Sequence, residues 1–262
     1  MTASESSSAN LHPIQNTIER LRALTQVNVQ NHWRCCAKDL PVSVATQSNQ
    51  WNDWSTAELN EKEYIAWGAG RQVMWLGQTF IIPHDLQGYP LTGLTLRLVL
   101  TWWAEYAQIF VNGQLVQEGD LFDSSARVLL SSAVVPGEEI VVALRLVSPG
   151  HDIGALMRSH CIYESTNSID PGFVADELTV LQKTIIAFEP EKLDRLAAAM
   201  AEIDWEMVSQ QEEFTRSLFQ LRQTLLSKIS NRTPPRACFQ TLYLPICCEE
   251  DPPHAPHPQR GP

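Results

Sequence analysis

The sequence predicts an α+β fold: an N-terminal helix, then a β-sandwich of jelly-roll type, then a helical segment and a disordered tail. From residue 94 to 102, and again from 140 to 146, apolar side chains occupy every second position, which places them on one face of a strand. After residue 170 they recur every three or four positions, as on one face of a helix. We therefore divide the chain into a disordered leader (1–10), an amphipathic helix (11–34), a sandwich domain (41–165), a helical segment (170–230) and a disordered tail (231–262).

Length and composition narrow the class of protein. The 262 residues suffice for one large or two modest domains, and the net charge of −11 argues against unassisted binding to nucleic acid or to an anionic membrane. The first residues lack the basic start and apolar core of a secretory signal, and no window approaches the roughly 18 apolar residues of a membrane span. The six cysteines include two adjacent pairs, which suit neither a disulfide framework nor a zinc site. We expect a cytoplasmic protein without nucleic-acid or membrane partners.

The N-terminal part changes from helical to strand spacing. Val42 and Val44 begin an alternation, and the apolar run from Val73 to Ile82 contains Gly77, where we expect a bend or bulge. The helix before them has charged residues on one side and an apolar stripe on the other, formed by Ile14, Ile18, Leu21, Leu24 and Val27.

Two predicted strands alternate most clearly. From Leu94 to Trp102, and again from Ile140 to Leu146, every even-numbered residue is apolar. Between these strands Asn112-Gly113 separates two apolar runs, and it favours a tight hairpin because the turn needs positive φ at both central residues. Short strands divided by such turns are typical of a sandwich or jelly roll.

The helical segment has a defined start. Asp170 is a good N-cap residue and proline is tolerated at the first helical position, so we expect a helix to begin at Pro171. Its apolar stripe contains Val174, Leu178, Leu181, Ile185 and Phe188. Pro190 should interrupt it and open a second helix, and a third should run to about Lys228.

The tail has a different composition. Eight of the sixteen prolines fall in the final 29 residues, and no helical or strand period persists there, so the tail cannot bury enough apolar surface to offset its ordering entropy. It is either a natural disordered tail or the product of a reading frame lost near Asn231. We prefer the second interpretation.

Three stretches of text carry a family resemblance. They are T-W-W-A-E-Y-A-Q-I-F-V-N-G-Q-L-V-Q-E-G-D-L-F-D-S-S (101–125), V-P-G-E-E-I-V-V-A-L-R-L-V-S-P-G-H-D (135–152) and D-P-G-F-V-A-D-E-L (170–178). They resemble the N-terminal region of glycoside hydrolase family 38 α-mannosidases, in the bacterial and vacuolar or cytosolic branch. The resemblance covers roughly residues 14–230. The strand–Asn-Gly–strand core alone is shared with many galactose-binding-like sandwiches. The sequence that follows this core is therefore more specific for the family.

The resemblance implies a sandwich and a helical linker that precede a catalytic domain. That domain would contain a zinc motif with His-x-Asp, an aspartate nucleophile and an acid/base carboxylate. None of the seven histidines here is followed two positions later by Asp or Glu. We therefore predict no catalytic residues, no metal site and no cofactor in this chain, with zinc expected only in the parent family. The chain would be a non-catalytic portion of an α-mannosidase, inactive alone.

Trp103, Asp120 and Asp123 are the candidate carbohydrate-binding residues. Alternation places Trp102 in the core and Trp103 on the opposite face, where its indole would either pack against another domain or stack on a sugar. Asp120 and Asp123, beside Gly119, would either bind sugar hydroxyls or calcium, or form a turn with Asx hydrogen bonds.

Two further groups attract attention as metal or acid/base candidates. His32, Cys35 and Cys36 are packed into five residues, which rarely gives tetrahedral geometry, so we expect an ordinary helix end. His151-Asp152 lacks an oriented nucleophile and is expected to lie in a solvated loop.

Two other functions stay open beside the α-mannosidase portion. The chain is alternatively a free-standing carbohydrate-binding module, or a scaffold subunit that completes a separately encoded catalytic domain through its helices. The partners expected under these hypotheses are a carbohydrate or that catalytic domain.

Overall fold

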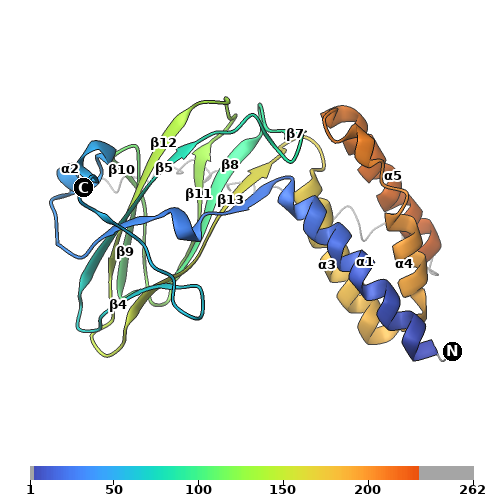
Figure 1. The fold of residues 1–262 in the computed structure, drawn as a ribbon, viewed down its shortest axis with the longest axis horizontal. Helices are drawn as coiled ribbons and strands as arrows, with labels where there is room; N and C mark the ends of the chain where they lie inside the picture. The colour runs from blue at the N-terminus through green and yellow to red at the C-terminus, as the bar shows by residue number, and fades with distance from the viewer. Residues whose placement is uncertain (1–2, 230–262) are drawn as a thin grey trace, which may run out of the picture.

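The computed structural model describes residues 3–229 and shows two packed parts (Figure 1). A β-sandwich forms one part, and helices α1, α3, α4 and α5 gather at one end of it. The first helix, α1, leads from the helical part into the sandwich, and the last sandwich strand leads back into α3. The predicted α+β order of helix, sandwich and helices is confirmed. The predicted tail (231–262) lies outside the described residues.

The sandwich consists of two antiparallel sheets. The first sheet, sheet A, has the strand order β1-β13-β8-β11, with β4 also paired to β13. The second, sheet B, has the order β10-β9-β12-β5-β2-β3. Sheet A is formed by β1 (Gln26–Asn28), β4 (Ile65–Trp67), β8 (Thr95–Trp103), β11 (Ser125–Ser131) and β13 (Gly154–Glu164). Sheet B is formed by β2 (Arg34–Cys36), β3 (Ser55–Thr56), β5 (Val73–Ile81), β9 (Tyr106–Val111), β10 (Gln114–Asp120) and β12 (Glu139–Val147).

The predicted alternation sets which side chains meet between the sheets. Along β8 and β12 the even-numbered residues are buried in one shared core. The hairpin between β9 and β10 turns at Asn112 (φ 49°) and Gly113 (φ 80°), as the Asn-Gly signal predicts. One face of each strand packs against the opposite sheet, which explains why the even-numbered positions of both strands are apolar. The buried even residues are Leu96, Leu98, Leu100, Trp102, Ile140, Val142, Leu144 and Leu146.

The N-terminal helix differs from its predicted bounds of 11–34. Helix α1 spans Ala3–Ala23, so it begins within the predicted leader and passes through Pro13. It ends early because β1 pairs with β13, with Val27 opposite Cys161. Ladder hydrogen bonds to a distant strand there replace the helical ones, and local spacing does not contain that information.

Two local strand predictions were wrong. Val42 and Val44 lie in a short helix, α2 (Val42–Ala45), instead of a strand. Gly77 causes no bulge, because β5 pairs with β12 without a register shift. A side chain at Gly77 would meet the ring of Trp51 at 2.7 Å, so glycine is needed there for the close approach of the indole.

The C-terminal helices follow the predicted order. Helix α3 (Pro171–Phe188) begins where Asp170 Oδ1 accepts a hydrogen bond from the Phe173 amide at 2.9 Å. Pro190 opens a 3₁₀ turn that leads into α4 (Leu193–Met200), and α5 follows (Gln211–Ile229). In the predicted stripe Val174, Leu178 and Ile185 are buried, whereas Phe188 is 80% exposed.

The helices pack against the sandwich through a small hairpin, β6 (Asp85–Leu86) and β7 (Tyr89–Pro90). Its Tyr89 is 1% exposed and its ring lies 6.2 Å from that of Phe214 in α5. This burial raises the pKa of Tyr89 to about 12, because the phenolate would lose its hydration. One apolar cluster joins both parts. Within residues 3–229 no helix is long and apolar enough to cross a bilayer.

Candidate functional site

Trp103 ends strand β8 on the outer face of sheet A. It is half-buried, whereas its neighbour Trp102 is 1% exposed in the core, so the predicted division of the two indoles is confirmed. Ala155 of β13 lies opposite Trp103, and Ala66 of β4 lies opposite Ala155. Directly paired residues share one face of a sheet. Across the three strands the large ring of Trp103 therefore lies beside the very small side chains of Ala155 and Ala66. This difference in size leaves a hollow next to the indole.

Asp152 orients the indole from the loop before β13. The Nε1–H of Trp103 donates to Asp152 Oδ2 at 3.1 Å, and Asp152 Oδ1 accepts from the Ile153 amide at 2.8 Å. A carboxylate held by two donors fixes the ring edge, so the indole keeps one orientation without being covered. Sequence reasoning placed His151-Asp152 in a solvated loop, and the exposed pair does lie in one, but this role of Asp152 was missed.

The loop from Asn60 to Tyr64 forms the opposite wall of the hollow. Asn60 Oδ1 accepts from the amides of Lys62 (2.9 Å) and Tyr64 (3.1 Å), and the Asn60 amide donates to the Tyr64 carbonyl at 3.0 Å. Glu63 has a φ of 61°, which a non-glycine residue adopts only where the surroundings hold it. The wall is thus a tight turn locked by a single asparagine.

The hollow between these walls has a volume of about 550 Å³. Its floor is apolar, with Ala66, Ala155 and Met157, and its rim carries hydrogen-bonding groups of both kinds. A volume of this size lies within the usual range for small-ligand sites. The rim groups come from Asn60, Glu61, Lys62, Tyr64 and Asp152.

A second hollow of about 710 Å³ continues on the other side of the same loop. The two share Lys62, Tyr64 and Met157, so one surface runs around the turn. His160 lies in the second hollow, where burial and then the nearby Arg158 cation lower its pKa. The neutral imidazole that results both donates and accepts hydrogen bonds.

Asp120 and Asp123 lie outside the hollow beside Trp103. They form a turn with Asx hydrogen bonds, which was one of the two alternatives predicted for them. Asp120 Oδ1 accepts from the amides of Asp123 (2.9 Å) and Phe122 (2.7 Å), and these bonds lower the pKa of the Asp120 carboxyl. Gly119 allows the turn to pack on Trp102, since a Cβ there would lie 2.5 Å from the indole. Neither aspartate lines the hollow beside Trp103.

We expected His32, Cys35 and Cys36 to lie at a helix end, but only His32 does, and the two cysteines lie in a strand. His32 closes a 3₁₀ turn (Gln30–His32), while both cysteines belong to β2 and pair with β5. Pairing to β5 forces neighbouring side chains onto opposite faces of the sheet. Within residues 3–229 no three His, Cys, Asp or Glu side chains converge on one point, so we assign no zinc ligands.

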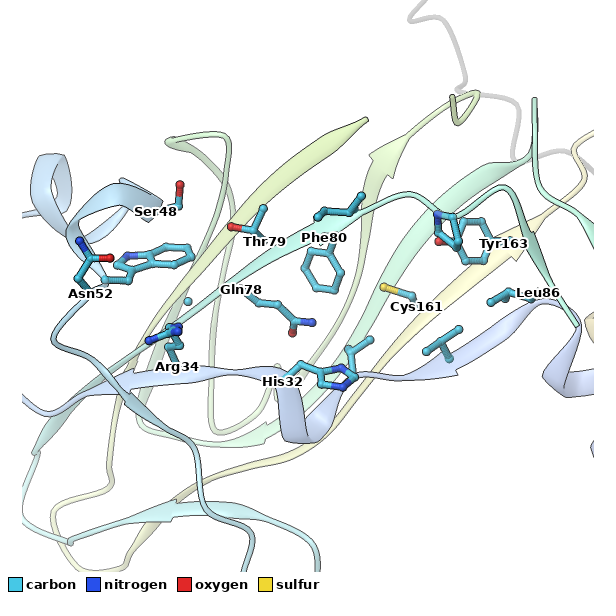
Figure 2. A pocket seen from close by; sticks show the side chains of 16 residues that line it. His32, Arg34, Ser48, Asn52, Gln78, Thr79, Phe80, Leu86, Cys161 and Tyr163 are labelled. Atoms are coloured by element: carbon cyan, nitrogen blue, oxygen red, sulfur yellow. The ribbon is translucent and has the colours of Figure 1, made fainter. Parts of the chain in front are cut away.

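A further hollow of about 580 Å³ was not predicted from the sequence (Figure 2). It lies at the open edge of the sandwich, where residues of β1 and β2 face residues of β5 and β13. Cys161 forms part of its wall, and burial raises the pKa of this thiol to about 12, so it is not a nucleophile at neutral pH. No sequence motif marks this site because its lining comes from separate strands.

Similar folds occur in solved glycosidases. A glycosyl hydrolase family 2 member from Bacteroides cellulosilyticus has 14% identity and a TM-score of 0.42, with 54% of this chain and 21% of that one covered. Bacteroides uniformis β-glucuronidase 2, bound to cyclophellitol-6-carboxylate aziridine, has 16% identity and a TM-score of 0.40 (53% and 17% covered). Ruminococcus gnavus β-glucuronidase has 10% identity and a TM-score of 0.34 (47% and 21% covered). The chain spans about a fifth of the length of these structures. No protein-family model and no curated protein matches the sequence.

Proposed function

We propose that this chain is the non-catalytic N-terminal portion of an α-mannosidase, a glycoside hydrolase of α-mannoside breakdown, and that its sandwich contacts saccharide through Trp103. The α-mannosidase assignment is supported by the family resemblance of the sequence at residues 101–125, 135–152 and 170–178. The contact with saccharide is supported by one observation above all: a half-buried indole held by Asp152 borders an apolar floor with a polar rim.

The chemistry of a sugar ring matches this arrangement. One face of a pyranose presents C–H groups, which pack on an aromatic ring, while its edge presents hydroxyls that donate and accept hydrogen bonds. Trp103 supplies the ring, and the rim supplies carboxylates at Glu61 and Asp152, an ammonium at Lys62 and an amide at Asn60. An aromatic wall and several convergent polar groups are the usual make-up of a ligand site.

Catalysis would belong to another part of the enzyme. A retaining glycosidase needs two carboxylates placed across the scissile bond, and this family also needs zinc. We assign neither a carboxylate pair of this kind nor a metal site to residues 3–229. The proposal therefore includes no α-mannosidase activity and no stoichiometric zinc in the purified chain, and a cytoplasmic location in which Cys35, Cys36 and Cys161 stay free thiols.

The helical part favours a second role, as a docking surface for a catalytic domain. On α3 and α5 several large apolar side chains face solvent: Val180 is 66% exposed, Phe188 80% and Phe219 49%. Exposed apolar side chains that cluster often mark an interface. In this scaffold hypothesis the catalytic domain, encoded separately or in the same polypeptide, would cover them.

Titration of the labelled protein with mannose disaccharides tests the sugar site. We expect amide shifts at residues 60–66 and 152–157, and a loss of affinity of about tenfold or more in Trp103→Ala, equivalent to ~1.4 kcal/mol. Phe122→Ala is the matched control, because Phe122 is an exposed aromatic outside the hollow. Equal binding by both variants, or no shift with any mannoside, would overturn the sugar site.

A separate assay tests the enzymatic part of the proposal. The purified chain, with added zinc, should release no aryl group from an aryl α-mannoside above the blank. Metal analysis should return no stoichiometric zinc. One bound zinc per chain, or zinc-dependent turnover, would contradict the assignment as a non-catalytic portion.

A further inference from the structure

The hollow at the open edge of the sandwich, called the groove below, runs along a stretch of β5 that pairs on one side only among the described strands. Strand β2 pairs with β5 only as far as Arg34, which lies opposite Gly77. Strand β5 continues for four more residues to Ile81. An edge of this kind presents main-chain donors and acceptors to any segment that lies beside it.

The ladder with β12 shows which main-chain groups face the open side. The Ile82 amide donates to the Glu138 carbonyl at 3.0 Å, and the Ile82 carbonyl accepts from the Gly137 amide at 2.8 Å. Because antiparallel residues alternate between their two neighbours, Thr79 and Ile81 direct their amides and carbonyls away from β12. Among the described strands these two residues have a register partner on β12 alone.

The edge of β5 forms one wall of the groove. The opposite wall is a fixed segment that crosses from sheet A to sheet B (Figure 2). It contains Val27, Val29 and His32. Buried hydrogen bonds hold it: Gln30 Nε2 donates to the Leu156 carbonyl at 2.7 Å, and Gln30 Oε1 accepts from the Ser159 hydroxyl at 2.7 Å. The groove is therefore preformed, which reduces the entropy lost on binding.

Gln78 places an unsatisfied acceptor inside this groove. It is only 8% exposed, and its Oε1 is buried without a hydrogen-bond partner among the described residues. Its side chain extends from β5 into the groove, whose lining also includes His32 of the crossing segment (Figure 2). A buried acceptor without a donor is unfavourable, so a ligand that donates an N–H or O–H there gains free energy.

Charge narrows the kind of ligand. Among the described residues that line the groove, Arg34 is the one with a permanent charge and none is Asp or Glu, although the whole chain has a net charge of −11. Its guanidinium makes a long contact of 3.4 Å from Nη1 to the Trp54 carbonyl. The remaining N–H donors suit a carboxylate.

We propose that the groove takes an extended polypeptide segment of a partner protein, which adds as a strand to β5. Its main chain would pair with Thr79 and Ile81, one donor would reach Gln78 Oε1, and an acidic side chain would bind Arg34. A polypeptide is favoured over a saccharide because alternating donors and acceptors at strand spacing match another main chain. The volume of about 580 Å³ accommodates a short segment.

A capped hexapeptide of alternating valine and threonine with one glutamate is the probe. Added to the labelled wild-type protein, it should shift the amides of Thr79 and Ile81 and slow their hydrogen exchange. The same peptide N-methylated at alternate amides should bind at least about tenfold more weakly. The unmodified peptide should likewise bind the variants Arg34→Gln and Thr79→Pro at least about tenfold more weakly than the wild-type protein. Thr79→Val keeps the edge amide and is the matched control for the proline variant.

Thr79→Pro should retain the fold because the amide it removes lies outside the ladder with β12. If it does not fold, the methylated peptide and Arg34→Gln still decide the question. Equal binding of both peptides would overturn strand addition, as would no shift at Thr79 and Ile81 up to the solubility limit of the probe. Shifts there with a mannose disaccharide instead would assign the groove to sugar. None of these results bears on Trp103.

Discussion

The outer faces of the two sheets each carry tryptophan, and they differ in what lies over it. On sheet B, Trp75 is 0% exposed, because Trp51 and Trp54 from the segment around α2 cover it together with Phe110 of β9. On sheet A, Trp103 is half-buried and borders a hollow. The same residue type therefore forms a second small core on one sheet and an accessible surface on the other.

Hydrogen bonding separates the two faces further. Within the described residues the indole N–H of Trp75 is buried without a partner, whereas that of Trp103 donates to the exposed Asp152. Packing alone thus fixes Trp75, while a directional bond orients Trp103. An indole that is oriented but uncovered is suited to contact something outside the chain, which is the basis of the proposed saccharide site.

The largest expected effect is on stability and distinguishes the two tryptophans. Trp75→Ala should lower the free energy of unfolding by about 3–5 kcal/mol, because it leaves a cavity under the aromatic cover. Trp103→Ala should lower it by only about 1 kcal/mol, since the ring is half-buried. Denaturant unfolding of both variants measures this difference. Equal losses would show that Trp103 is a core residue and would remove the contrast.

A second substitution tests the cover of sheet B itself. Gly77→Ala should cost about 1–3 kcal/mol, because the new Cβ meets the Trp51 ring at 2.7 Å and must displace it. Gly150→Ala is the control: its nearest neighbour would be Arg71 Nε at 3.9 Å, so it should be nearly neutral. Thermal unfolding with tryptophan fluorescence reports both. A neutral Gly77→Ala would mean that Trp51 packs loosely.

The bond that orients Trp103 should matter for binding more than for folding. Asp152→Ala should weaken saccharide affinity about fivefold, equivalent to ~1 kcal/mol, and leave the unfolding midpoint nearly unchanged because the carboxylate is exposed. Calorimetric titration beside thermal unfolding measures the two effects. Affinity that equals the wild type would show that the indole needs no such support.

The smallest effect concerns the Asp120 turn, which we separate from the Trp103 hollow. Amide donors lower the pKa of Asp120 in the folded state, so their stabilising contribution is present above the unfolded pKa and is lost as pH falls through the folded one. A carboxyl-carbon NMR titration should place this pKa below the ordinary aspartate value of about 3.9. Adding a saccharide should not move it. A shift on saccharide addition would join the turn to the binding surface.

The sequence predicted the features that depend on neighbours along the chain. Alternation located β8 and β12, the Asn-Gly signal located the hairpin, and Asp170 located the start of α3. Alternation also predicted that Trp102 lies in the core and Trp103 on the opposite face of the strand.

Features that depend on distant segments were missed. The early end of α1 comes from pairing with β13, and Gly77 is needed for the close approach of Trp51 and not for a bulge. Likewise Tyr64 and Asp152 reach the Trp103 hollow from separate loops, so no local spacing marks them as a site.

Fluorine NMR of the protein labelled with 5-fluorotryptophan tests the central claim most directly. The resonances of Trp103 and Trp75 are assigned by their loss in Trp103→Phe and Trp75→Phe. On titration with a mannose disaccharide the Trp103 resonance should shift in a saturable way while the Trp75 resonance stays in place. A Trp103 resonance that does not move with any mannose disaccharide would contradict the proposal that this face of the sandwich contacts saccharide.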